Sequence, residues 1–160
     1  MLFRSILREL AFPETDPIHD EVNNLFVEIE WMTDSDASQG YNWVYDQIVS
    51  IGELVATRIV SGFLQLQQLD NTWLDVRDVL RTDNTYREGK VDWDITAGLI
   101  SKKIKALFEK SPWVITQGFI GATSENFTTT LGREGSDYTA AIFSYCLDAR
   151  EMTEIGRAHV

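Results

Sequence analysis

The sequence is poor in cysteine, histidine, proline and positive charge. Its 160 residues include one cysteine, two histidines and three prolines. Cys146 therefore has no partner for an intrachain disulfide, and its place in an apolar helical pattern favours a small buried side chain over a reactive thiol. An unpaired cysteine suits a reducing compartment, so we expect a cytoplasmic protein.

Charge and hydropathy exclude further classes of function. Lysine and arginine number 14 against 25 aspartates and glutamates, which gives a formal net charge of −11. Nucleic acids and anionic membranes require a basic face, so neither is expected as the main partner. No apolar run is expected to span a bilayer, and no secretory signal is visible. With 44% hydrophobic residues, the chain is expected to fold as one domain.

Short predicted strands alternate with long predicted helices. Helical spacing of apolar residues covers 20–32, 41–69 and 96–109. Strands are predicted at 72–76, 113–116 and 128–131, with 91–95 as a strand or an extended lead-in. This order predicts an α/β fold, a layered αβα sandwich with a largely parallel sheet, in which ligands bind beyond the carboxyl ends of the strands. Three tryptophans in or beside these strands are expected in the core: Trp73, Trp93 and Trp113.

The stretch 128–147 combines three features that favour anion binding. A β-branched strand comes first, a tight turn between Gly132 and Gly135 follows, and Ser136 or Asp137 is placed to cap the next helix. Unpaired N–H groups at a glycine turn and a helix start attract a carboxylate or a phosphate. The sequence therefore predicts an anion site here.

Two charged side chains are candidate ligand contacts. Arg133 lies in the glycine turn, and its forked donor face suits a carboxylate. Glu53 lies in the helix 41–69, whose apolar surface is so wide that we expect it to be buried in the middle of a layer. Residues three and four positions from Glu53 include no cation, so its carboxylate needs a cation from elsewhere in the fold or from a ligand. An exposed glutamate is the alternative.

The turn also resembles a known signature. Thr-Thr-Thr-Leu-Gly-Arg-Glu-Gly-Ser-Asp-Tyr-Thr-Ala-Ala at 128–141 resembles the signature loop of the aspartate kinases, which are members of the amino acid kinase family. The segments 114–121 and 50–54 are similar to others in these enzymes, and the resemblance extends from about 20 to about 152. It implies the amino acid kinase fold, L-aspartate and ATP as partners, and ATP with Mg²⁺ as cofactors of the full-length parent.

The resemblance also implies roles for individual residues. Asp137 orients the cationic groups around the transferred phosphate and is the catalytic position. The positions that bind substrate are Arg133, Ser136, Gly132 and Gly135 at a carboxylate and Glu53 at the amino group. Weaker matches are Asp75, Arg77, Arg81, Thr82, Gly118 and Gly121. Asp75 and Arg77 could instead form a surface ion pair, and no metal ligands are expected in the chain.

One residue departs from the pattern. The family commonly has glycine where this chain has Glu134. If that position requires a positive φ, a glutamate there is strained, and its charge weakens an anion site.

Several parts of the family pattern do not occur in the sequence. The opening Lys-Phe-Gly-Gly-Thr-Ser loop and the later Asp-Val-Pro-Gly segment are missing. We therefore expect residues 1–160 to be one partial domain, inactive alone, from a homo-oligomeric parent with or without a fused homoserine dehydrogenase. Residues 1–5 and 154–160 resemble adapter-derived tails, which leaves about 6–153 as native.

Two other functions remain open from the sequence. One is another member of the amino acid kinase family, and the other is a non-catalytic α/β binding or interaction module. The second predicts that Glu53 and Arg133 lie far apart, each in its own salt bridge.

Overall fold

The computed structural model describes residues 2–35 and 39–156. The elements are α1 Leu2–Glu9, α2 Ile18–Ser35, α3 Tyr41–Leu66, β1 Thr72–Trp73, the 3₁₀ helix η1 Val76–Asp78, α4 Trp93–Phe108, β2 Val114–Ile115, β3 Ile120–Ala122, β4 Thr128–Thr130 and α5 Gly135–Cys146. The polar composition of 34–40 favours a loop, and residues 36–38 of this stretch lie outside the described residues.

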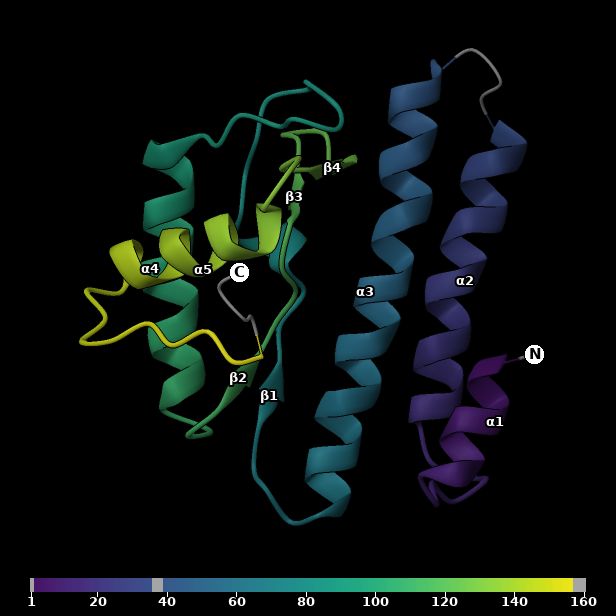
Figure 1. The fold of residues 1–160 in the computed structure, drawn as a ribbon. Helices are drawn as coiled ribbons and strands as arrows, with labels where there is room; N and C mark the ends of the chain where they lie inside the picture. The colour runs from purple at the N-terminus through teal and green to yellow at the C-terminus, as the bar shows by residue number, and fades with distance from the viewer. Residues whose placement is uncertain (1, 36–38, 157–160) are drawn as a thin grey trace.

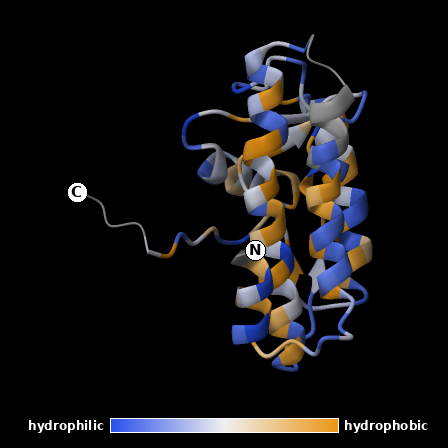
Figure 2. Cartoon of the chain, turned by 90° about the vertical axis from the view of Figure 1, so that its right-hand side faces the viewer, coloured by the Kyte–Doolittle hydropathy of each residue, from blue (hydrophilic) through white to orange (hydrophobic). Residues whose placement is uncertain are grey.

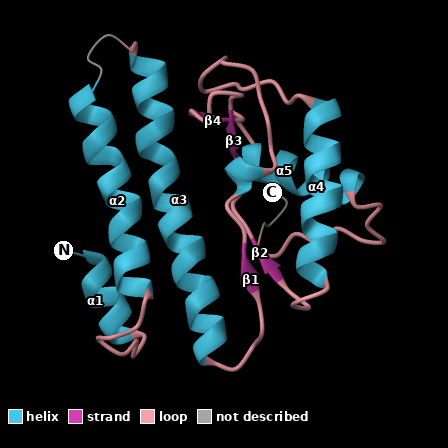
Figure 3. Ribbon diagram, turned by 180° about the vertical axis from the view of Figure 1, so that it is seen from behind, coloured by secondary structure: helices cyan, strands magenta, loops and turns pink. Residues whose placement is uncertain are grey.

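The elements form three layers. Helices α2 and α3 run side by side on one face of the strands, and α4 with α5 covers the other face (Figures 1 and 3). The core between the layers includes Leu54 of α3, Ile100 of α4 and Ile142 of α5, all fully buried. The predicted layered α/β architecture is confirmed.

The described strands form two pairs. Strand β1 is parallel to β2, with Thr72 opposite Val114, whereas β3 is antiparallel to β4, with Ile120 opposite Thr130. The sequence predicted a longer first strand, over 72–76. It ends early because the Asp75 carboxylate accepts the Arg77 N–H and turns the chain into η1.

Two of the three predictions about tryptophan are wrong, and the predicted extended lead-in at 91–95 is present only at its first two residues. Val91 forms an isolated antiparallel bridge with Thr82, and Asp92 is extended. The Asp92 carboxylate accepts the Ile95 N–H and caps α4, so the helix begins at Trp93. Trp93 is 40% exposed and meets two tyrosine rings of α5, and Trp113 is 62% exposed. Of the three tryptophans expected in the core, only Trp73 packs against it.

Helix α3 is buried on one face only. Its inner face includes Ile51, Leu54 and Ile59, but Val49 and Val60 of the neighbouring row are exposed, so full burial of this helix was a wrong prediction. Figure 2 shows hydrophobic residues along the long helices, and those of α3 that are exposed include Ile48, Val49 and Val60. By length and composition alone, α3 could also cross a membrane, contrary to the sequence prediction, but core helices of soluble proteins pass the same test.

Side chains of α3 pair with the free edge of β4. The Gln47 amide donates Nε2–H to the Thr128 carbonyl at 2.7 Å and accepts the Thr128 N–H at 2.9 Å. The Asp46 carboxylate accepts the Thr130 N–H at 2.9 Å and its hydroxyl at 2.8 Å. These two buried side chains replace a neighbouring strand, because they satisfy backbone groups that would otherwise be unpaired.

The turn before α5 has left-handed backbone at a residue that is not glycine. Glu134 is the N-cap of α5, with φ 58° and ψ 23°, and no side chain caps the helix. The expected capping by Ser136 or Asp137 is therefore wrong, because the helix has already begun at Gly135. The positive φ considered at Glu134 is present.

Replacing Gln47 by glutamate tests the pairing at β4. Gln47→Glu keeps the shape but places a carboxylate oxygen against the Thr128 carbonyl, so the free energy of unfolding at pH 7 should fall by about 3 kcal/mol in urea titrations. A protonated carboxyl can donate again, which raises its folded-state pKa, so the loss should shrink as the pH falls to about 4. Asn23→Asp, an exposed amide-to-acid change on α2, is the control. A loss independent of pH would contradict the pairing.

Replacing Glu134 by glycine tests the strained turn. Glu134→Gly removes the Cβ at a positive φ, so we expect the free energy of unfolding to rise by about 1 kcal/mol. Glu134→Gln removes only the charge and should change stability little. Urea denaturation of the two variants separates the effects, and an equal gain in both would show that charge, and not backbone strain, is the cause.

Candidate functional site

Two glycine loops pack against each other at the start of α5. A Cβ added at Gly118 would lie 2.7 Å from the Ser136 hydroxyl oxygen, and one at Gly135 would lie 2.6 Å from the Phe119 Cβ. Gly132, with φ 78°, makes the turn between β4 and α5. The loop after β2 and the loop after β4 therefore meet, and only glycine permits this approach.

Arg133 lines a cavity of about 690 Å³ on one side of this contact. The cavity lies between α3, the segment 85–88 and the Gly132 turn, and its walls include Tyr45, Val49, Tyr86, Arg87, Phe119 and Thr130. Within the described part of the chain, the Arg133 guanidinium has no hydrogen bond or ion pair. The side chain is exposed, and its N–H groups can donate hydrogen bonds to an anionic group.

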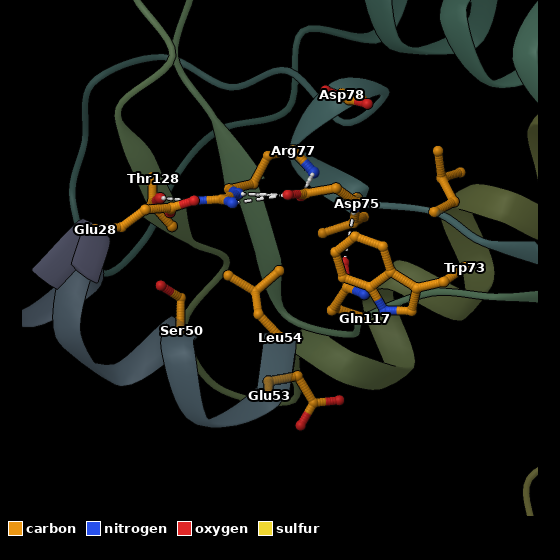
Figure 4. A network of polar contacts seen from close by, with 12 residues as sticks. Glu28, Ser50, Glu53, Leu54, Trp73, Asp75, Arg77, Asp78, Gln117 and Thr128 are labelled. Atoms are coloured by element: carbon orange, nitrogen blue, oxygen red, sulfur yellow. Dashed lines mark hydrogen bonds and ion pairs between the residues drawn. The ribbon is translucent and has the colours of Figure 1, made fainter. Parts of the chain in front are cut away.

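Glu53 lines a second cavity, of about 450 Å³. Gly118, Ser136 and Thr139 also line it, together with apolar residues of α4 and α5. The Glu53 carboxylate points away from the ion pairs around Arg77 (Figure 4). No cation among the described residues forms an ion pair with it.

The two cavities adjoin. Gly118 lines one and Phe119, the next residue, lines the other. Val49 and Glu53 are likewise one helical turn apart on α3 and line different cavities. Glu53 and Arg133 thus line neighbouring cavities that meet at the loop 118–119 and along one turn of α3.

Gln117 ties the loop after β2 to helix α3. Its buried side chain accepts the Val76 N–H at 2.8 Å and donates to the Thr57 hydroxyl at 2.8 Å. Thr57 in turn donates to the Glu53 carbonyl. Gln117 therefore fixes the Gly118 loop relative to the helical turn that carries Glu53. Sequence reasoning missed it, although a glutamine between a buried strand and a glycine is a signal for a buried polar contact.

Asp75 and Arg77 belong to a structural ion-pair network. The Arg77 guanidinium donates to both Asp75 oxygens, at 2.7 Å for the closest contact, and to Glu28 of α2 at 3.1 Å (Figure 4). Burial alone would lower the pKa of Arg77, but the bonds and charge of Asp75, with Glu28, raise it above its usual range. The network joins α2 to η1, and it occupies the donors of Arg77.

The other weaker matches also make contacts within the fold. Arg81 donates to the Thr123 carbonyl and to Asn126, and the buried Thr82 hydroxyl lies 2.6 Å from that of Thr129. A Cβ at Gly121 would lie 2.8 Å from a Leu80 methyl. These positions support the sheet beside the cavities.

The carboxylate of Asp46 lies behind the wall of the Arg133 cavity. Burial raises its pKa, and the N–H groups of Arg87 and Thr130 oppose the rise. Among the described residues, no group of three or more potential ligands could hold a metal ion. Ser136 and Asp137 lie in the first turn of α5, where helix N–H groups favour negative charge.

Comparisons with known proteins show the family of the chain. A family model described as the amino acid kinase family matches residues 6–155. Lysine-sensitive aspartokinase 3 of Escherichia coli is 34% identical over 148 residues, which are 92% of this chain and 32% of that protein. Bifunctional aspartokinase/homoserine dehydrogenase 2 of Arabidopsis thaliana is 32% identical over 85% of this chain and 14% of its own length. The chain thus spans about a third or less of these relatives.

Solved structures give the same result. The crystal structure of E. coli aspartokinase III in complex with aspartate and ADP superposes with a TM-score of 0.78 at 34% identity, covering 89% of this chain and 31% of that one. Aspartate kinase of Clostridium acetobutylicum shares the fold, with a TM-score of 0.67 at 21% identity. The chain belongs to the amino acid kinase family.

Proposed function

We propose that the chain forms the amino-acid-binding part of an aspartate kinase, which transfers the γ-phosphoryl group of ATP to the side-chain carboxylate of L-aspartate. One observation carries the proposal: a cation and an anion without partners among the described residues, Arg133 and Glu53, line adjoining cavities at the Gly118 contact. An α-amino acid carries the complementary pair of charges. Arg133 would bind its α-carboxylate and Glu53 its ammonium group.

The chemistry requires no general base. The side-chain carboxylate of aspartate has a pKa of about 4, so it is ionised at neutral pH and can attack directly. A carboxylate oxygen forms a bond to the γ-phosphorus while the bond to the β–γ bridging oxygen breaks, and ADP leaves with that electron pair. The contribution of the protein is positioning and charge neutralisation, in which Ser136 and the first N–H groups of α5 would take part.

Other partners follow from the relatives and are part of the proposal. The E. coli structure contains aspartate and ADP, so the enzyme would use an adenine nucleotide. We assign contacts with the substrate carboxylate to Ser136 and to the backbone of Gly132 and Gly135, beside Arg133, and Asp137 would orient the cationic groups around the transferred phosphate. Bound Mg²⁺ would neutralise phosphate charge, but the described residues contain no ligand cluster for it. We further propose a cytoplasmic, homo-oligomeric enzyme; fusion to homoserine dehydrogenase is a property of the plant relatives.

The two competing functions have less support. An interaction module would pair Glu53 and Arg133 in separate salt bridges, and the ion pairs of the described residues include neither. Another amino acid kinase would not be expected to contain both Ser-Ile-Gly-Glu at 50–53 and the full signature at 128–141.

Titration of the 160-residue chain with L-aspartate tests the binding site. Calorimetry should detect selective binding, with D-aspartate and L-glutamate at least about tenfold weaker. Arg133→Gln and Glu53→Gln each remove one charge-assisted contact and should weaken L-aspartate binding about tenfold or more.

Matched controls are Arg150→Gln and Glu109→Gln, exposed residues that line neither cavity. Both should bind like the unsubstituted chain. Binding that survives loss of Arg133 and of Glu53 would refute the proposed site.

A coupled ADP-release assay tests whether residues 1–160 suffice for turnover. The chain spans 32% of the E. coli relative and does not contain the Lys-Phe-Gly-Gly-Thr-Ser phosphate loop. We expect no aspartate-dependent phosphoryl transfer above the blank. A rate of about 1 s⁻¹ or more, which is typical of kinases, would show that these residues hold the complete catalytic apparatus.

A further inference from the structure

A second arginine lines the same cavity as Arg133. Arg87 projects from the segment between Thr82 and Val91, and its guanidinium lies 4.8 Å from the centre of the Tyr45 ring of α3. Stacking on an aromatic face orients a guanidinium while leaving its N–H donors at the edge free. The side chain is exposed, so these donors are accessible to a ligand.

The backbone of Arg87 is held against the Arg133 turn. Its N–H donates to the buried Asp46 carboxylate at 2.8 Å, and its φ is 70°, a left-handed value that costs a non-glycine residue about 1 kcal/mol. A Cβ added at Gly132 would lie 3.0 Å from the Arg87 carbonyl oxygen, and the Gly89 N–H donates to the Thr130 carbonyl. The two arginines therefore belong to segments that contact each other through the backbone. These contacts fix the position of one segment relative to the other.

These two arginines differ from the arginines that support the fold. Arg58 pairs with Glu21, Arg77 with Asp75 and Glu28, and Arg81 with Asn126. In the described part of the chain, neither the Arg87 nor the Arg133 guanidinium forms a hydrogen bond or ion pair. Both guanidinium groups line one cavity, so their N–H groups can donate to an anion bound there.

We propose that Arg87 binds a second carboxylate, that of the ligand's side chain, while Arg133 binds the first. Arg87 would then determine specificity for a dicarboxylic amino acid over its side-chain amide. The acidic Glu88 also lines the cavity and opposes the attraction of the two arginines for a bound anion. The inference rests on the proposed function, because it assumes that Arg133 binds an amino-acid carboxylate.

L-Asparagine is the matched probe, since it differs from L-aspartate only by an amide in place of the side-chain carboxylate. Calorimetric titrations of the 160-residue chain should give aspartate binding about tenfold tighter than asparagine binding. Arg87→Gln should lower the aspartate affinity about tenfold, leave the asparagine affinity unchanged and so abolish the preference. Arg133→Gln should weaken both ligands.

Two further variants separate binding from folding. Arg87→Gly relieves the left-handed backbone, so it should keep the chain folded and still abolish the preference for aspartate. Lys90→Gln removes one positive charge from the same segment outside this cavity and should keep the preference.

The outcomes distinguish the two claims. If Arg87→Gln keeps the preference while Arg133→Gln weakens both ligands, the role of Arg87 is refuted and the proposed function stands. If Arg133→Gln changes neither affinity, or the folded chain binds neither ligand, both are refuted. If Arg87→Gln weakens ADP and not aspartate, Arg87 serves a nucleotide phosphate and the inference is wrong.

Discussion

The pairing of two α3 side chains with the edge of β4 is the constraint on which the site depends. Gln47 makes both hydrogen bonds that a neighbouring strand would make with Thr128, and Asp46 accepts the N–H of Thr130. Each buried backbone group that is left unpaired lowers the free energy of unfolding by about 1–3 kcal/mol. Removing this contact would leave several such groups unpaired at once. Because side chains and not a strand supply the partners, the helix is fixed in register against β4.

That register determines where the candidate site residues lie. Arg133 comes three residues after the end of β4, and Glu53 comes seven residues after Asp46 on the same helix, about two turns along one face. A third acceptor contact of Asp46, from the Arg87 N–H, adds the segment that carries the second arginine. The buried Asp46 carboxylate thus fixes the relative positions of the segments that carry Glu53, Arg87 and Arg133, which are far apart in sequence.

Much of this arrangement follows from the sequence, and the rest depends on tertiary contacts. Periodicity identified α2, α3 and α4, and the signature at 128–141 located the turn with Gly132 and Gly135 because these features are local. The exposure of Trp113 and the start of α5 at Gly135 could not be read locally. The first depends on what packs beside β2, and the second on the left-handed backbone of Glu134, which makes that residue the N-cap and leaves it outside the helix.

Two charged residues at or next to the Arg133 cavity have left-handed backbone, and their charges are opposite. Glu134, next to Arg133, brings a negative charge to an anion site and weakens it, whereas Arg87 brings a positive charge to the same cavity. Each bears a backbone cost of about 1 kcal/mol that a glycine would not bear. Glu134 reduces the attraction of the cavity for a carboxylate, and in the proposed role Arg87 restores it. The strain at Arg87 is then maintained by its bond to Asp46, the same carboxylate that fixes α3 against β4.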